Sequence, residues 1–237
     1  MRRLFFRPSW RLPALCGLLF VAAGCVDREP EQRAAFIRFL QARVIEAPGR
    51  AVRAPVGEER DALGEYVVQY EVIGDFQEAL DDALDVQARV LEALSLHSVG
   101  ELLARADAFE DLRGDLARSR ETLQRAREVA DEARGGLLQA DDLKRVYAAA
   151  YDKAVTRAAA DALALCPACD PALQDAGRAA AYARAQDGQI LLDGALVQVR
   201  DPSVRTQLNT LLQALNAHSD EIGAAQRRLR ALRPPGG

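Results

Sequence analysis

An apolar residue recurs at every seventh position along the middle of the chain, and this repeat constrains the fold more than any other feature. The repeat consists of Leu102, Phe109, Leu116, Leu123, Ala130 and Leu137. Seven residues make almost two helical turns, so these side chains share one face of a long helix. Leu112, Ala126 and Ala133 fill intermediate positions of that face, while Arg105 and Ser119 interrupt it. Such a face needs a partner helix to cover it.

The partner helix is predicted immediately upstream. Its apolar face contains Leu63, Tyr66, Val67, Tyr70, Ile73, Phe76, Leu80, Ala83, Gln87, Val90 and Leu94, spaced mostly by three and four residues as in a helix. Residues 95–98 are typical of a chain reversal, and Ser98 followed by Glu101 has the spacing of a capping box. We therefore expect one helix to end near residue 94 and the next to run from residue 99 to 137. Together they form an antiparallel coiled-coil hairpin.

Shorter helical patterns flank this hairpin. They cover residues 29–46, 141–165, 170–185 and 202–232. The Asp193-Gly194 pair between two apolar runs favours a β-hairpin within residues 189–199. The composition is rich in Ala, Leu, Arg and Glu, as in helical proteins. The predicted fold is all-α: an elongated helical bundle with a long antiparallel coiled-coil hairpin and one minor β-hairpin.

The N-terminus has the pattern of a cleaved export signal. Residues 1–11 are basic, and residues 12–23 form an apolar run that ends in small residues before Cys25. The run is shorter than the roughly 20 apolar residues of a membrane-spanning helix. Small residues before a cysteine resemble a bacterial lipobox, which implies cleavage before Cys25 and acylation of that cysteine. An ordinary signal peptide and an uncleaved anchor are the alternatives.

This pattern predicts four segments. Residues 1–24 form the lipoprotein signal peptide, and residues 25–29 form the lipidated N-terminus with a short tether. Residues 30–233 form the helical domain, and residues 234–237 form a disordered tail. Val26 stands where an inner-membrane retention signal has Asp. We therefore expect the protein on the periplasmic face of the outer membrane.

Removing the signal peptide changes the charge of the chain. The full sequence has 31 basic and 35 acidic residues, and residues 1–24 contain four arginines but no acidic residue. The mature chain therefore has 27 basic residues and a net charge of −8. A protein that acidic has no general attraction for nucleic acid. The single Met (Met1) and the single Trp (Trp10) are removed as well.

Cys166 and Cys169 form a Cys-x-x-Cys motif with three interpretations. After Cys16 is removed and Cys25 is acylated, these are the only free thiols, and an oxidising periplasm favours a disulfide between them. A redox-active pair is a second interpretation, although such enzymes use a thioredoxin-like βαβ framework that this sequence lacks. A metal site is the third, and zinc would need about two more ligands. We favour a structural disulfide.

The remaining candidate residues have simpler interpretations. His218 lies on the apolar face of the last predicted helix, which favours packing over a role as a base, and His97 lies in a turn. Two tyrosine pairs share helix faces, Tyr66 with Tyr70 and Tyr147 with Tyr151; core packing is favoured over a ligand platform. Solvated faces and helix caps explain the acidic clusters better than carboxylate pairs or calcium ligands. These clusters are Asp81, Asp82, Asp85, Asp141 and Asp142.

Two blocks of sequence resemble the YiaF-like bacterial lipoproteins. One runs from Gly24-Cys25-Val26-Asp27 through Gln32-Arg33-x-Ala35-Phe36-Ile37-Arg38-Phe39-Leu40-Gln41. The other includes Asp141-Asp142-Leu143-Lys144, Val146-Tyr147 and Tyr151-x-Lys153-Ala154-Val155. The resemblance implies lipidation at Cys25 and supplies no catalytic residue, because the family's domain is one of unknown function. Cys166 and Cys169 are not part of the shared pattern.

These observations predict a lipid-anchored envelope protein that acts by protein–protein contact, as a spacer, adapter or assembly factor. We expect no enzymatic activity, cofactor or metal. The expected partners are the membrane, through the lipid on Cys25, and an unidentified envelope protein, with no nucleic acid. The chain itself is expected to be a monomer, because its long apolar faces can cover one another. The alternatives are a thiol–disulfide oxidoreductase using Cys166 and Cys169, and a helical carrier of an apolar ligand.

Overall fold

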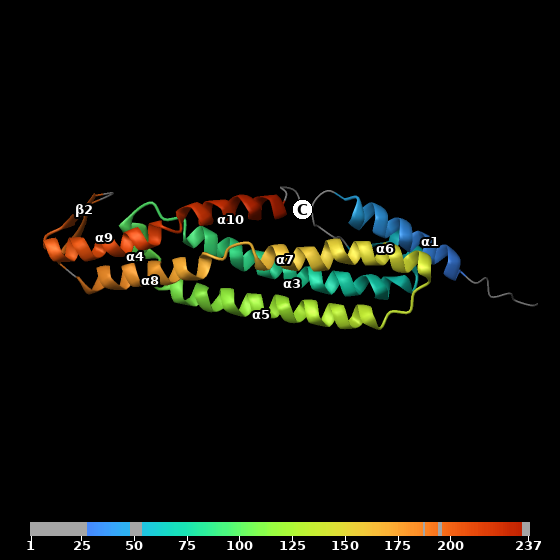
Figure 1. Cartoon of the computed structure of the whole chain (residues 1–237). Coiled ribbons are helices and arrows are strands. Elements are labelled where there is room, and N and C mark those ends of the chain that lie inside the picture. Colours follow the sequence, from blue (N-terminus) through green and yellow to red (C-terminus); the bar gives the residue numbers. More distant parts are fainter. Residues whose placement is uncertain (1–27, 48–53, 187, 194–195, 234–237) are drawn as a thin grey trace, which may run out of the picture.

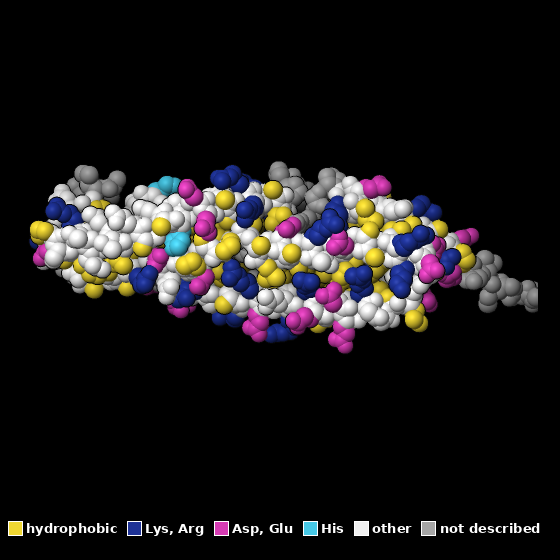
Figure 2. Space-filling view, viewed as in Figure 1, with side chains coloured by type: hydrophobic (Ala, Val, Ile, Leu, Met, Phe, Trp, Pro, Cys, Tyr) yellow, Lys and Arg dark blue, Asp and Glu magenta, His cyan; other side chains and the backbone are white. Residues whose placement is uncertain are grey.

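The computed structural model is an elongated rod of helices (Figure 1). It describes residues 28–47, 54–186, 188–193 and 196–233. The predicted signal peptide, Cys25 and the predicted tail at 234–237 lie outside these ranges. The prediction of an all-α bundle with one minor β-hairpin is confirmed. Basic and acidic side chains are interspersed along the rod (Figure 2).

The predicted antiparallel hairpin forms the axis of the rod. Helix α3 (Tyr66–Ala93) packs against α5 (Ala108–Gly135), and each has 28 residues, a length of about 42 Å (Figure 1). The seven-residue repeat lies on the buried face of this pair. Leu102, Phe109, Leu116, Leu123 and Ala130 are all buried, and Leu137 is partly buried.

The helix predicted for residues 99–137 is divided, so that expectation was wrong. Helix α4 (Val99–Ala104) ends three residues before α5 begins, although it starts as predicted with the Ser98 hydroxyl accepting from Glu101 N at 3.1 Å. Arg105 lies in the break. Its Nη1 donates to the carbonyls of Glu92, Ala93 and Ser95 at 2.9–3.3 Å. These carbonyls lie in the last turn of α3 and just beyond it, so Arg105 caps the end of α3 instead of continuing the apolar face.

One end of the rod contains the N-terminal helix and the helix that follows α5. Helix α1 (Glu29–Phe39) continues as a π-helical segment, η1 (Leu40–Ile45). Helix α6 (Asp141–Tyr151) likewise continues through η2 (Asp152–Arg157) into α7 (Ala158–Leu163). Lys153 joins the two: its Nζ donates to Ile45 O at 2.9 Å and to Ala47 O at 2.8 Å. The lysine thereby satisfies carbonyls at the end of η1.

Gly64 makes the joint between α2 (Glu58–Leu63) and α3. Its φ of +54° is one that only glycine adopts without strain, and a Cβ there would lie 2.2 Å from the Gln32 side chain. The absence of a side chain at this position lets α1 pack directly over the joint.

The other end of the rod contains α8 (Cys169–Ala185), β1 (Ile190–Asp193), β2 (Leu196–Val199) and α9 (Pro202–Asn216). The strands are antiparallel, with Ile190 opposite Val199. Asp201 caps α9, accepting from Ser203 N at 2.6 Å. The single helix predicted for residues 202–232 is instead interrupted at Ala217–His218, after which α10 (Ser219–Leu232) returns along α3.

The buried side chains form two clusters. The proximal core lies between α1, α6, η2, α7 and the adjoining parts of α3 and α5, and its aromatic residues are Phe36, Phe39, Tyr70, Phe76, Tyr147 and Tyr151. The distal core lies between α8, α10 and the opposite parts of α3 and α5, and its one buried aromatic residue among those described is Phe109. None of the helices in the described ranges has the length and apolar character that crossing a bilayer requires.

Candidate functional site

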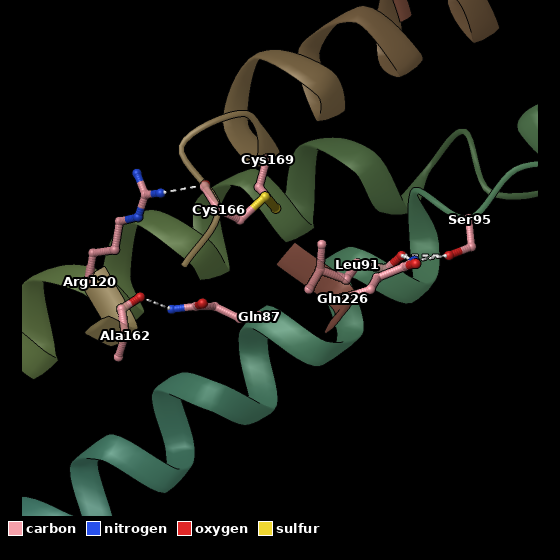
Figure 3. The surroundings of a disulfide bond; sticks show 8 residues. All are labelled: Gln87, Leu91, Ser95, Arg120, Ala162, Cys166, Cys169 and Gln226. Carbon is pink, nitrogen blue, oxygen red and sulfur yellow. Dashed lines mark hydrogen bonds between the residues drawn. A yellow bond between two sulfur atoms is a disulfide. The ribbon is translucent and has the colours of Figure 1, made fainter. Parts of the chain in front are cut away.

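Cys166 and Cys169 form a disulfide at the corner between α7 and α8 (Figure 3). Their Cα atoms are 5.4 Å apart, and both side chains are buried. Leu165 belongs to the proximal core, whereas both cysteines belong to the distal core. The disulfide therefore lies where the two cores meet.

Both helices of the central hairpin contribute a polar side chain to this corner. Arg120, on α5, donates from Nη2 to Cys166 O at 3.1 Å, and Gln87, on α3, donates from Nε2 to Ala162 O at 2.9 Å (Figure 3). Carbonyl groups in the last turn of a helix have no helical partner. Arg120 and Gln87 thus add a second hydrogen bond to carbonyls at this corner, which also accept from Cys169 N and Leu165 N.

The geometry of the corner disfavours thiol chemistry. Reactive cysteines are partly exposed, because a thiolate has to reach its substrate and leave again. Here Cys169 is fully buried at the start of α8, and Cys166 is nearly so. Both sulfurs are bonded to each other, so neither is a thiolate ligand for a metal. The described parts of the chain also contain no group of three His, Cys, Asp or Glu residues placed to bind a metal ion.

Sequence reasoning missed Gln87 and Arg120 as parts of this corner. Within the described residues, Gln87 Oε1, Arg120 Nε and Ser119 Oγ are buried without a hydrogen-bond partner. Each such atom costs about 1–3 kcal/mol of desolvation. Two of these residues did carry a signal in the sequence. Gln87 is the polar member of the apolar face of α3, and Ser119 interrupts the seven-residue repeat.

His218 and Asp175 form a second polar cluster, at the joint between α9 and α10. His218 Nε2 lies 3.0 Å from Asp175 Oδ2, and Arg178 also contacts this buried carboxylate. Burial by itself would raise the pKa of Asp175, but the hydrogen bonds from Arg178 and His218 outweigh it and hold the pKa below its usual range. The hydrogen bond to Asp175 gives the His218 ring a polar partner at the packed joint of α9 and α10, which agrees with the packing interpretation.

An Asp–His pair can orient a catalytic base, but the hydroxyl of the adjoining Ser219 is not directed at this pair. The hydroxyl of Ser219 donates to Asn216 O at 2.7 Å and so points to the backbone. His97 is exposed in its turn, as predicted, and its Nδ1 lies 3.5 Å from the Glu101 carboxylate. In the described part of the chain, each histidine side chain has a carboxylate as its partner, Asp175 for His218 and Glu101 for His97.

The tyrosine pairs are part of the core, which confirms the packing interpretation. Tyr70, Tyr147 and Tyr151 are buried, and the Tyr147 hydroxyl donates to Gln69 O at 2.8 Å. Tyr66 is partly exposed, and its hydroxyl donates to Glu29. Partial burial, together with this hydrogen bond, raises the pKa of Tyr66 to about 12.

The acidic clusters lie on exposed helix faces and in first turns. Asp142 accepts from Leu143 N at 2.9 Å and pairs with Arg33 at 3.5 Å. Arg233 contacts the Asp85 carboxylate and the Asp81 carbonyl. The solvated-face interpretation fits these residues, but α6 begins after Ala140 without a side-chain cap, so neither Asp141 nor Asp142 is the predicted N-cap.

Two hollows open on the surface near the proximal core. One, of about 820 Å³, lies between the start of α1 and the start of α3, where charged residues of both signs such as Arg28 and Glu65 line it. The other is a groove of about 470 Å³ between α3 and α5, with Val72, Phe76 and Val129 among its apolar residues. Both volumes lie within the range of small-molecule sites.

Comparisons with known proteins place the chain among relatives without an assigned role. A family model described as "Protein of unknown function (DUF3053)" matches residues 12–230. The uncharacterised protein YiaF of Escherichia coli (strain K12) is 27% identical over 219 residues, which cover 91% of this chain and 92% of the relative. The uncharacterised protein YiaF of Shigella flexneri matches to the same extent. No solved structure matches.

Proposed function

Because this chain belongs to the DUF3053 family of proteins of unknown function, we propose its role from its own sequence and shape. It is a lipid-anchored protein of the bacterial envelope, cut before Cys25 and held at the outer membrane by acyl chains on that cysteine. There it binds another envelope protein, as a spacer or adapter, and does not catalyse a reaction.

This proposal rests on the distance between the two ends of the rod. The first described residue, Arg28, precedes α1 at one end, and the β-hairpin and the start of α9 lie at the other (Figure 1). Helix α3 alone spans about 42 Å of this distance. A chain tethered at Cys25 can therefore present its far end well away from the membrane surface.

Site-specific photo-crosslinking in living cells tests the contact. A crosslinking residue replaces Leu191 or Gln198, which lie opposite each other in the β-hairpin at the far end. The matched control replaces Arg125, an exposed residue on the side of the rod. We expect the far-end positions to capture a specific envelope protein that the Arg125 position does not capture. Capture of nothing from the far end would contradict the spacer role.

The anchor has its own test. A Cys25→Ser variant should lose the acyl chains, which mass spectrometry of the N-terminal peptide detects, and should leave the membrane fraction. A Val26→Asp variant should move the protein toward the inner membrane. If the wild-type N-terminal peptide carries no lipid, the proposed anchor is wrong.

The groove between α3 and α5 favours a second candidate, a carrier of an apolar ligand. Its volume of about 470 Å³ and its apolar residues suit part of a lipid chain. Native mass spectrometry of the detergent-purified protein should then detect a bound lipid in addition to the anchor. A Val129→Asp variant should lose that lipid, and a single mass for the acylated protein alone would exclude the carrier.

A further inference from the structure

Exposed apolar side chains gather at the end of the rod from which the N-terminus emerges. Leu138, in the turn between α5 and α6, is 95% exposed. Val68 on α3 and Val129 on α5 are 65% and 61% exposed, and both line the groove between their helices. Val68 also lines the hollow beside Arg28.

Contacts between side chains fix the position of the Leu138 turn relative to the start of α1. Gln139, the neighbour of Leu138, donates from Nε2 to Gln69 Oε1 at 2.7 Å. Three residues earlier on α3, Tyr66 donates to Glu29 in the first turn of α1. The turn and the first described residues therefore lie side by side at this end of the rod (Figure 1).

The short tether limits how far this end can be from the membrane. Three peptide units separate Cys25 from Arg28, and a fully extended chain of that length spans about 11 Å. An acylated Cys25 lies at the bilayer surface, so Arg28 lies within about one helix diameter of that surface. The exposed Leu138 turn at the same end then lies within reach of the lipid.

We propose that Leu138 inserts into the lipid surface that holds the acyl chains of Cys25. The proposal rests on the proposed lipid anchor and adds a second, non-covalent contact with the membrane. Two contacts on neighbouring elements restrict the tilt of the rod, so that its far end points away from the bilayer.

Apolar burial, and not charge, provides this contact. Charged residues of both signs surround the turn, including Arg134, Asp141 and Lys144, and Figure 2 shows this mixture at the same end of the rod. Such a surface has no net attraction for anionic lipid headgroups. The insertion is therefore expected to be insensitive to salt, because the hydrophobic effect is not screened by ions.

Tryptophan fluorescence tests the insertion. Since the single Trp of the chain lies in the removed segment, Leu138→Trp in the full, acylated protein introduces one tryptophan. The matched control is Leu191→Trp at the far end. Both proteins are reconstituted into phosphatidylethanolamine–phosphatidylglycerol vesicles with or without brominated acyl chains. We expect the Leu138→Trp emission to shift to the blue and to be quenched severalfold more by the brominated lipid than the Leu191→Trp emission.

Each other outcome overturns the proposal. Equal quenching at both positions means that the rod lies flat on the bilayer. Absence of quenching at both means that the turn stays in water or faces another protein, and a crosslinker at residue 138 would identify that protein. Mass spectrometry of the same sample shows whether the insertion alone is wrong or the lipid anchor as well. Acylated protein without quenching disproves the insertion alone, whereas protein without acyl chains disproves the anchor on which it rests.

Discussion

The two cores of the rod differ in their content of buried aromatic rings, although both contain buried alanines. The proximal core is held by aromatic contacts: Phe36 stacks on Tyr66 with ring centroids 5.4 Å apart, and Phe39 meets Tyr70 edge-on at 5.0 Å. The distal core depends on small residues of α8. These are Ala172, Ala176, Ala179 and Ala180, all fully buried.

This difference shows that one pair of long helices can be packed in two ways. In the proximal core, large rings fill the space between helices and supply most of the buried apolar area. In the distal core, alanines let helix backbones approach closely, so little free volume is left for a larger side chain. The proximal core should therefore be sensitive to lost volume, and the distal core to added volume.

The largest effect is expected from lost volume in the proximal core. Phe36→Ala should lower the free energy of unfolding by about 3–5 kcal/mol, because the ring is fully buried and the cavity cannot close completely. Chemical denaturation measures the loss, and hydrogen exchange should show faster opening of α1 and α6 than of α8. Phe36→Leu is the control and should cost less. A loss below about 1 kcal/mol for Phe36→Ala would contradict the prediction that the proximal core is sensitive to lost volume.

Added volume should damage the distal core by a smaller amount. Ala176→Leu should cost about 1–3 kcal/mol, since Ala176 is fully buried and its neighbours would have to move. Ala181→Leu, at an exposed position of the same helix, is the matched control and should be nearly neutral. Equal effects of the two variants in chemical denaturation would show that the distal core is not tightly packed.

The Asp175 cluster gives the distal region a dependence on pH. Because its hydrogen bonds hold the pKa of Asp175 below the usual range, its contribution to stability is present above about pH 4, the pKa of an unfolded Asp, and is lost as the pH falls through the lower folded pKa. Asp175→Asn should cost about 1–2 kcal/mol at pH 7 through the weakened charged hydrogen bonds.

Thermal unfolding of the two proteins from pH 7 to pH 2 measures this dependence. The difference between wild type and Asp175→Asn should narrow below about pH 4, where the wild-type carboxylate becomes protonated. A difference that stays constant over the whole range would show that the carboxylate charge contributes nothing.

The smallest effect is expected from the disulfide. It closes a loop of only four residues, so Cys166→Ala/Cys169→Ala should cost at most about 2 kcal/mol. Far-ultraviolet circular dichroism should be unchanged, and vesicle binding and partner crosslinking should stay at wild-type levels. Loss of crosslinking by a folded variant would instead support the thiol–disulfide alternative.

The sequence predicted those parts of the fold that depend on local spacing. The seven-residue repeat from Phe109 to Ala130 identified the buried face of α5, and the helical pattern beginning at residue 202 identified the start of α9. The breaks at Arg105 and His218 could not be predicted in the same way. Arg105 leaves the apolar face because carbonyls at the end of α3 lie within its reach, and His218 because Asp175 does. The partners lie 10–13 residues from Arg105 and 43 residues from His218, so neither contact follows from helical spacing.

The candidate site shows the same distinction between features that local spacing predicts and contacts that depend on packing. The spacing of Cys166 and Cys169 was enough to suggest the disulfide that the structure contains. Its polar neighbours were not predictable, because Gln87 and Arg120 contact carbonyls whose positions depend on how α7 packs against the hairpin. Cys25, the one residue predicted to be modified, lies outside the described residues and stays a prediction.

The π-helical segments η1 and η2 have a consequence for how this chain can change in length. A π-helical turn contains one residue more than an α-helical turn, and both complete one revolution. Loss of one residue from η2 would therefore restore a regular α-helical turn without rotating the helix that follows. The buried alanines of α7, Ala158, Ala159 and Ala162, would keep facing the hairpin. Deletion of one residue within η1 or η2 should thus be tolerated better than deletion of one residue within α3 or α5, which would turn all later residues of that helix by about 100°.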